Sequence, residues 1–385
     1  MKNTILQKYN TPSISDMLII IPFFNPTQSI RITQNLLINY SKLINSNIPF
    51  HIIHCILPND NPILPTNQHY STIQSNSILF CKENIVCLTI KKFIDKYDKF
   101  MMLDSDVIFS STNFYDKVSN LLNDYDVIHP FDKIYYLNIN FQNISKPYYS
   151  YIDYILNKDK YDNINNHNKD IINSLQEQIN KNNIKINNIQ NIKKSSFIKS
   201  TNRKIIPINN TTIIKNIQND NIKLQNDINN IQNKIIEFKQ GFSFAFTKNL
   251  FLTNIIPEEC VIGGGDVIFI KIFQNNINIW IPQIYHNILH TRKLQHNIKF
   301  TFLKNENIFH LYHNDIKNRQ HTSRYNIIKK YLSPDINIYD IIHRNSQGLY
   351  QWNDDIRNDI NKDVLQYFID RQDDEYEIDN KIIYL

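Results

Sequence analysis

The chain has 385 residues, a formal net charge of +6 and 42% apolar residues. This length suits one large or two ordinary domains, and so mild a charge suits an anionic ligand without requiring nucleic acid. Residues 1–16 lack the apolar core of a signal peptide, and the apolar run at 17–24 is too short to span a bilayer. We therefore expect a soluble, cytoplasmic protein with no membrane span.

The first part of the chain alternates apolar runs of strand length with helical patterns. Strands are predicted at 17–21, 51–57 and 99–103, and helices at 26–44, at 82–97 and after a cap at Thr112. After the first strand, Asn25 is predicted as the N-cap of a helix with Pro26 at its first position. This order predicts a doubly wound α/β sheet, in which ligands bind beyond the carboxyl ends of the strands.

Two carboxylates, Asp104 and Asp106, directly follow the strand at 99–103. Charged groups beside a buried strand are costly unless something compensates them. Carboxylates one residue apart can share a hard divalent cation, which prefers oxygen ligands; the alternative is a solvated turn. The PFFN sequence at 22–25 also follows a strand, so we expect both stretches to face one crevice.

Residues 157–235 differ in composition from the rest of the chain. They are rich in Asn, Ile and Lys and contain no glycine, and they show weak helical spacing near 213–236. We interpret the segment as an insertion of long helices or partly disordered chain. Its interleaved aspartates argue against a nucleic-acid-binding arm.

Glycine is scarce, with five in the whole chain, and three of these are consecutive at 263–265. Glycines before a helix let the backbone approach a ligand closely, which makes Gly264 and Gly265 candidate binding residues. Asp266 follows them and is either a helix N-cap or a general base. A strand is predicted before this run at 240–246, a short helix opening at Thr247, and a further strand after it at 278–281.

Two histidines, His310 and His313, lie three residues apart later in the chain. They are either structural or nitrogen ligands for a borderline cation such as Mn²⁺. Lys317 and Arg319 follow, and they either meet a phosphate or belong to a solvated helix face. The four cysteines match no zinc or disulfide framework, which favours free thiols.

Taken in order, these stretches resemble glycosyltransferases of the GT-A fold, and in particular the β-1,4-galactosyltransferase and polypeptide N-acetylgalactosaminyltransferase groups. The similarity rests on IIIPFFN at 19–25, FCKENIVCLTIKKF at 80–93, LDSD at 103–106, the stretch 241–266 that ends in GGGD, and HNDIKNR at 313–319. It implies a Rossmann-like mixed sheet. The domains would be a nucleotide-binding half at 1–156, the Asn-rich helical insertion at 157–235, a catalytic half at 236–332 and a helical C-terminal appendage at 333–385.

The resemblance also implies roles for individual residues. Asp106 would bind Mn²⁺ or Mg²⁺, Asp104 would hold the ribose or a metal-bound water, and Asp266 would be the catalytic base. His313 would complete the metal site, with His310 as its substitute. Substrate binding would involve Pro22, Phe23, Asn25, Lys82, Asp104, Gly264, Gly265, Lys317 and Arg319.

The sequence thus predicts a metal-dependent, inverting glycosyltransferase that moves a sugar from a nucleotide sugar, UDP-sugar favoured, to a hydroxyl of a glycan or glycoprotein. Phe24 stands where the galactosyltransferases carry arginine, which leaves donor specificity open. One alternative is a retaining transferase or a sugar-phosphate nucleotidyltransferase of the same fold, although the latter usually has a glycine-rich loop after its first strand. Another is a non-catalytic scaffold protein. The abundance of Asn, Ile and Lys indicates an AT-rich genome and hence a viral or protist source, for which the cytoplasm would be that of the host.

Overall fold

The computed structural model describes residues 7–195, 210–274, 283–292, 298–314, 324–332 and 337–374. Lys317, Arg319 and the strand predicted at 278–281 lie outside these residues. The chain divides into two compact units. Met1–Leu156 and Phe238–Leu385 form the sheet unit, and Asn157–Glu237 form the helical-pair unit.

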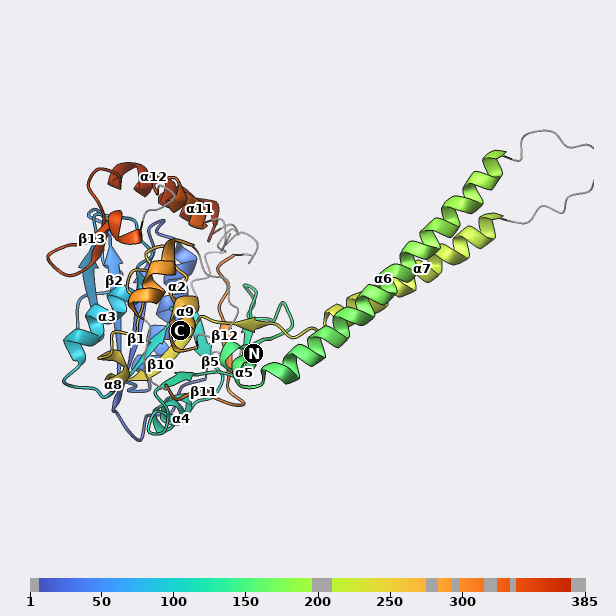
Figure 1. The fold of residues 1–385 in the computed structure, drawn as a ribbon. Coiled ribbons are helices and arrows are strands. Elements are labelled where there is room, and N and C mark those ends of the chain that lie inside the picture. Colours follow the sequence, from blue (N-terminus) through green and yellow to red (C-terminus); the bar gives the residue numbers. More distant parts are fainter. Residues whose placement is uncertain are drawn as a thin grey trace, which may run out of the picture. The chain divides into compact units, whose positions relative to one another are not determined.

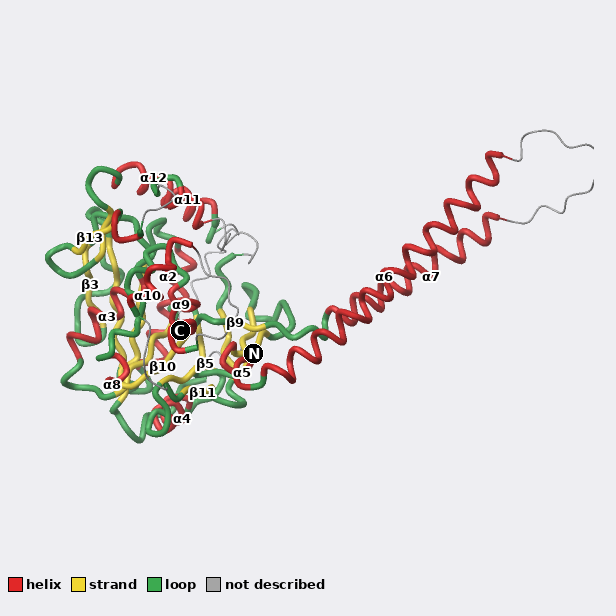
Figure 2. Tube along the Cα trace, in the orientation of Figure 1, coloured by secondary structure: helices red, strands yellow, loops and turns green. Residues whose placement is uncertain are grey.

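The sheet unit contains a large mixed sheet (Figures 1 and 2). Its strands are β1 (Met17–Phe24), β2 (Phe50–Ile56), β3 (Tyr70–Gln74), β4 (Lys99–Leu103), β6 (Val127–His129), β10 (Ser243–Thr247) and β11 (Phe300–Phe302). Within the described residues their order is β11-β6-β10-β4-β1-β2-β3. β1 pairs in parallel with β2 and β4, whereas β10 runs antiparallel to both β4 and β6. The predicted mixed α/β sheet is therefore present.

The described helices of the sheet unit are α2 (Ile30–Ile44), α3 (Lys82–Phe93), α4 (Phe114–Leu121), α5 (Tyr151–Leu156), α8 (Lys248–Phe251), α9 (Gly265–Phe273), α10 (His286–Thr291), α11 (Arg324–Lys329) and α12 (Arg357–Asp370), with 3₁₀ turns at Gln283–Tyr285 and Ile338–Asp340. Thr247 caps α8 as predicted, by accepting a hydrogen bond from the amide of Leu250. α4 instead begins after Asn113, not at a Thr112 cap. The hairpin β13 (Ile342–Arg344) and β14 (Tyr350–Trp352) precedes α12, so the described C-terminal part is not helical throughout.

Helices cover both faces of the large sheet. Alternate residues of β1 belong to different apolar clusters: Leu18 and Ile20 pack with α3 and α9, and Ile19 and Ile21 pack with α2 and α4. Because successive side chains of a strand point to opposite faces, an uninterrupted apolar strand such as β1 is buried on both. This is the doubly wound arrangement that the sequence pattern predicts.

A second sheet contains β5 (Val107–Phe109), β7 (Lys133–Tyr136), β8 (Tyr148–Ser150), β9 (Phe238–Lys239) and β12 (Asn307–His310), in the order β5-β12-β7-β8-β9. β12 runs antiparallel to β5, with His310 opposite Val107. The pairing brings a strand from late in the chain alongside the residues that directly follow Asp106. The periodicity of the sequence did not predict this second sheet, because its strands are short.

The helical-pair unit consists of α6 (Lys158–Ser195) and α7 (Asn210–Gln232), which pack against each other. Asparagine amides join them: Asn182 donates to Asn221 over 2.9 Å, and Asn221 donates to Asn183 over 2.9 Å. Ile228 is buried at 2% exposure. The Asn-rich composition is therefore compatible with a pair of long helices, because side-chain amides can act as donor and acceptor at once.

The start of α2 differs from the sequence prediction. Its N-cap is Ser29, whose hydroxyl accepts from the amide of Ile32, and Pro26 lies outside the helix. Asn25 instead bridges to Ser29, accepting from its amide at 2.9 Å and donating to its carbonyl at 2.8 Å. Pro22, Phe23 and Phe24 belong to β1, so the strand is longer than predicted and a turn that begins at Asn25 separates it from the helix. The Asn25 amide is engaged in holding this turn.

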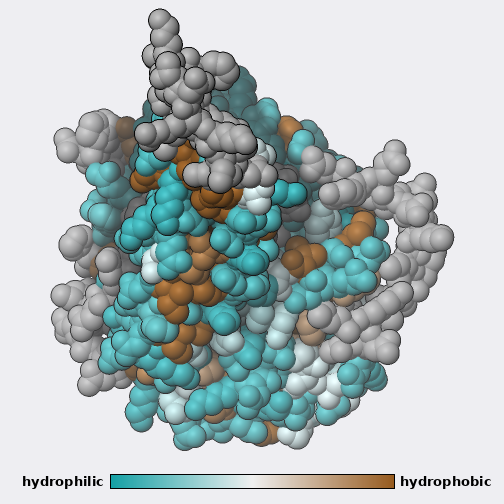
Figure 3. All heavy atoms as spheres, turned by 90° about the vertical axis from the view of Figure 1, so that its right-hand side faces the viewer, coloured by the Kyte–Doolittle hydropathy of each residue, from teal (hydrophilic) through white to brown (hydrophobic). Residues whose placement is uncertain are grey.

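Among the described residues, no helix combines the length and apolar character that crossing a membrane requires. On the face drawn in Figure 3, hydrophilic side chains predominate and apolar side chains gather in patches between them.

A buried amide of α2 holds the turn that carries the two carboxylates. The side chain of Asn39 is 1% exposed and donates to the carbonyls of Ser105 and Val107, at 3.2 and 2.7 Å. The Asp104 amide in turn donates to the carbonyl of Phe242 over 2.9 Å. The conformation of the turn is therefore set by contacts from two other parts of the fold.

We predict that Asn39→Ala lowers the free energy of unfolding of the sheet unit by about 1–3 kcal/mol, because it leaves buried carbonyls without donors. Urea denaturation followed by tryptophan fluorescence measures this change. Asn120→Ala, at an exposed position of α4, is the matched control and should stay close to wild type. Equal stabilities of the Asn39 and Asn120 variants would contradict the assignment.

Candidate active site

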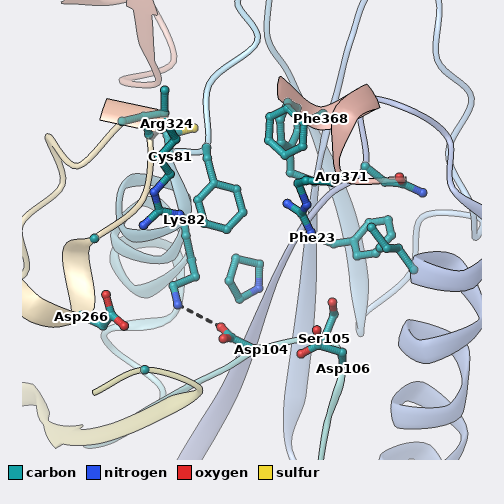
Figure 4. Close-up of a pocket in the computed structure, with 18 of the residues that line it drawn as sticks. Phe23, Cys81, Lys82, Asp104, Ser105, Asp106, Asp266, Arg324, Phe368 and Arg371 are labelled. Atoms are coloured by element: carbon teal, nitrogen blue, oxygen red, sulfur yellow. Dashed lines mark hydrogen bonds and ion pairs between the residues drawn. The ribbon is translucent and has the colours of Figure 1, made fainter. Parts of the chain in front are cut away.

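A cavity of about 450 Å³ lies at the carboxyl ends of β1 and β4 (Figure 4). Its wall includes residues from the first turns of α3 and α9 and from α11 and α12. Of the residues predicted from the sequence, the lining includes Pro22, Phe23, Asn25, Lys82, Asp104, Asp106, Gly264, Asp266, His310 and His313. Gly265 is buried behind the wall. Stretches far apart in the chain therefore share one cavity.

Asp106, His310 and His313 form a cluster with the donor set of a cation site. Oδ2 of Asp106 lies 2.7 Å from Nε2 of His313 and 3.3 Å from Nε2 of His310. One ligand atom from each residue lies within 4.8 Å of the others. Adjacent ligands of an octahedral cation with bonds of about 2.1 Å are about 3 Å apart, so these spacings fit such an ion. One carboxylate and two imidazoles form a mixed oxygen and nitrogen donor set of the kind that divalent transition-metal ions bind.

Asp373, from the segment after α12, orients one of these imidazoles. Nδ1 of His313 donates to its carboxylate over 3.1 Å, which leaves Nε2 directed at Asp106. A metal-binding histidine usually has such a partner on its other nitrogen, because that bond selects the tautomer and fixes the ring. Asp373 was not predicted, because nothing local in the sequence links it to a histidine 60 residues earlier.

Asp104 is not part of this cluster, and its partner is Lys82. Its carboxylate is 2.9 Å from the ammonium of Lys82, the contact drawn as a dashed line in Figure 4. Burial raises the pKa of Asp104, and the positive charge of Lys82 opposes that rise. Burial alone would lower the pKa of Lys82, but the charges of Asp104, Glu83 and Asp266 raise it above its usual range. Lys82 thus compensates the charge of Asp104.

Asp266 lies in the first turn of α9, whose N-cap is Gly264 with φ of 90°. Its carboxylate reaches the backbone of Gly241, where an added Cβ would lie only 2.5 Å from Oδ2. His129 holds this backbone in place, with Nε2 donating to the Gly241 carbonyl over 3.1 Å and Nδ1 accepting from the Ser150 hydroxyl over 2.7 Å. Gly241 is therefore required for the position of the Asp266 carboxylate.

The three consecutive glycines make room for side chains of the cavity wall. Added Cβ atoms would lie 2.7 Å from Nη1 of Arg324 at Gly263, 2.4 Å from the Tyr325 hydroxyl at Gly264, and 2.2 Å from the Glu83 carboxyl at Gly265. The scarcity of glycine in the chain indicated that these three positions require glycine. The reason is steric, because any larger residue there would clash with other side chains of the protein. The role of Gly264 and Gly265 in substrate binding stays a prediction.

Glu83 is a further acidic residue of the wall that sequence reasoning missed. It follows Lys82 in the first turn of α3, where an acidic residue is ordinary because it complements the helix dipole. It is 2% exposed, and its Oε2 atom is buried without a hydrogen-bond partner. Burial raises its pKa to about 7, the charge of Lys82 lowers it, and that of Asp266 raises it.

No protein-family model matches the sequence, and no curated protein matches it. Solved structures that resemble part of the fold include a protein described as a nucleotide-diphospho-sugar transferase from Desulfovibrio desulfuricans, at 15% identity and a TM-score of 0.23. Another is a glycosyltransferase involved in glycosylation of the major capsid of PBCV-1, at 11% identity and a TM-score of 0.17. Each alignment covers 33% of this chain, and 60% and 54% of the respective structures.

The pKa of Glu83 is about 7 in the folded protein, compared with its usual value of 4.5. The contribution of Glu83 to the free energy of unfolding is therefore most favourable below pH 4.5, and it is lost as the pH rises to about 7. We predict that Glu83→Gln, which keeps the shape without the charge, gains stability relative to wild type between pH 5 and 8. Thermal melts across that range measure it. Asp95→Asn, at an exposed position, should show no such trend. A constant difference between Glu83→Gln and wild type would refute the buried titration.

Proposed function

We propose that this chain is a metal-dependent glycosyltransferase of the GT-A type that transfers a sugar from a nucleotide sugar, with a UDP-sugar favoured, to a hydroxyl acceptor on a glycan or glycoprotein. The observation that supports this most directly is the convergence on one cavity of Asp104, the Asp106–His310–His313 cluster and Asp266. These groups come from the middle of the chain, from near residue 310 and from the first turn of α9. A solvated turn or an isolated N-cap would not account for their meeting.

The donor would bind with its nucleoside towards Pro22, Phe23 and Asn25, at the carboxyl end of β1, where ligands of open α/β sheets bind. Phe24, Phe80 and Phe368 place further aromatic rings there, with centroids 5.7 Å apart for Phe24 and Phe368. A divalent cation at Asp106, His310 and His313 would supply positive charge to the leaving diphosphate. Lys82 lines the same cavity, and its ammonium would donate to the diphosphate while it stays paired with Asp104.

Asp266 would act as the general base. It would take the proton of the acceptor hydroxyl as that oxygen forms a bond to the anomeric carbon and the bond to the diphosphate oxygen breaks. Attack from the face opposite the leaving group inverts the configuration. Binding both substrates in one cavity supplies proximity. Residues 22–27, at the end of β1 and directly after it, contain no glycine, which disfavours a nucleotidyltransferase that cradles phosphates at that point.

We predict that Asp106→Ala abolishes sugar transfer and weakens Mn²⁺ binding by at least about tenfold, because it removes the carboxylate ligand of the cluster. Isothermal titration with Mn²⁺ and then with UDP measures both effects. Asp124→Asn, an exposed carboxylate of the same unit, is the control. Binding of Mn²⁺ and UDP by Asp106→Ala at wild-type affinity would exclude this metal site, and the absence of any binding by the wild type would favour a scaffold protein.

We predict that Asp266→Asn leaves Mn²⁺-dependent UDP binding near wild type but lowers the transfer rate by about 10²–10⁴-fold, the usual contribution of a general base. A panel of nucleotide sugars with released UDP as the readout identifies the donor and supplies the rate. Full turnover by this variant would remove Asp266 as the base while leaving the metal site intact.

A further inference from the structure

Arg324 is a cation of the cavity wall that the proposed mechanism does not use. It is the first residue of α11, and its guanidinium lies in the space that a side chain at Gly263 would occupy. An added Cβ there would be 2.7 Å from Nη1 and 2.9 Å from Cζ, and Gly263 has φ of 80°. The absence of a side chain at Gly263 therefore allows the guanidinium to lie against the loop before α9.

No described residue forms an ion pair with Arg324, and the Asp266 carboxylate acts on its charge from a greater distance. Its Nη2 atom donates to the Tyr325 hydroxyl over 3.0 Å, and its Nε atom is buried without a hydrogen-bond partner. Across the stretches that the structure describes, no carboxylate oxygen lies within 4.0 Å of it. A guanidinium is always charged and offers five N–H donors, so a buried one without an anion is costly.

Of the other cations that line the wall, Lys239 lies over the ring of Tyr148, and Lys82 and Arg371 differ from Arg324 in being paired with carboxylates. Lys82 pairs with Asp104 at 2.9 Å, and Arg371 pairs with Asp373 at 3.3 Å. Both are compensated by carboxylates of the protein itself. Among Lys82, Arg371 and Arg324, only Arg324 forms no ion pair with the described residues. Its guanidinium can therefore bind an anion from outside the protein.

Arg324 also lies on a different side of the cavity from the expected nucleoside pocket. Figure 4 shows Arg371 beside Phe23 and Phe368 on one side, and Arg324 above Lys82 on the other side, where Asp266 also lies. On the proposed function, the first side takes the nucleoside, and the Asp266 side takes the transferred sugar and the acceptor. An anion held by Arg324 would then belong to a sugar and not to the nucleoside.

We propose that Arg324 forms an oxyanion subsite on the Asp266 side of the cavity, and that a sugar bound there carries a carboxylate or phosphate group. The inference rests on the proposed function for the identity of the ligand as a sugar. A planar guanidinium matches either oxyanion in a two-point contact. The charged group belongs to the transferred sugar or to the acceptor, and binding measurements separate these two sources.

The test is calorimetric titration in the presence of Mn²⁺. In one arm UDP-glucuronate is compared with UDP-glucose, which places the charge on the transferred sugar. In the other arm the protein saturated with UDP is titrated with glucuronate, with glucose 6-phosphate and with glucose, which places the charge on the acceptor. We expect the wild type to bind the charged ligand at least about tenfold more tightly in one of the arms, as for hydrogen bonds to charged groups.

Arg324→Gln should abolish this preference, and Arg324→Lys should retain part of it, because the charge remains without the planar fork. Lys329→Gln removes one positive charge from an exposed position of the same helix and should behave as wild type. Unchanged Mn²⁺ affinity and an unchanged melting temperature of Arg324→Gln would show that the site is still folded. Equal affinities for charged and neutral ligands in both arms, or a preference that persists in Arg324→Gln, would overturn the proposal.

Failure of the proposed function gives a different result. A wild type that binds no UDP with Mn²⁺ refutes the nucleotide-sugar donor. In that case glucuronate and inorganic phosphate are titrated alone into wild type and Arg324→Gln. Weaker binding of either anion to the variant supports the oxyanion subsite, and equal binding overturns it.

Discussion

The pairing of β12 with β5 is the contact on which the candidate site depends. β5 begins one residue after Asp106, and His310 ends β12 opposite Val107. The amide of Leu311 then donates to the Asp106 carbonyl over 2.8 Å, which fixes the turn that carries His313. Two imidazoles are thereby held against a carboxylate from which they are separated by more than 200 residues. The backbone hydrogen bonds between β12 and β5 are thus sufficient to hold the side chains of Asp106, His310 and His313 together, and no bound ion is needed for it.

Around this contact, the structure gathers several charged side chains in one cavity and compensates most of them. Ion pairs within the protein compensate Asp104 and Arg371, and burial favours the neutral form of Glu83. The glycines contribute by leaving room, since each of the three consecutive residues abuts a polar side chain of the wall. A chain with five glycines has placed four of them next to ionisable side chains of one cavity.

The segment after α12 links the cluster of Asp106, His310 and His313 to α2. Asp373 receives the hydrogen bond of His313, while Asp374 accepts from the Ser29 hydroxyl and from the amides of Ile30 and Arg31 at the start of α2. α2 in turn supplies Asn39 to the carboxylate turn and Asn35 to the carbonyl of Tyr312. These contacts connect α2, near the start of the chain, and the segment after α12, near its end, to the residues of the cluster. The geometry of the cluster therefore depends on the folding of the whole sheet unit.

The sequence by itself determined the elements with strong local signals. The apolar runs of β1, β2 and β4 predict buried parallel strands, and the scarcity of glycine marks Gly241 and the run at 263–265 as positions under constraint. Asp104, Asp106 and Asp266 could be selected because acidic residues at the ends of buried strands or next to glycines are uncommon.

The tertiary structure decided which side chains these residues contact. Glu83, Arg324 and Asp373 carry no local signal, because their environment is made by residues distant in sequence, and the true start of α2 depends on Asp374, a carboxylate more than 300 residues away. Local periodicity reports which face of an element is buried, whereas ion pairs and metal ligands depend on which elements meet.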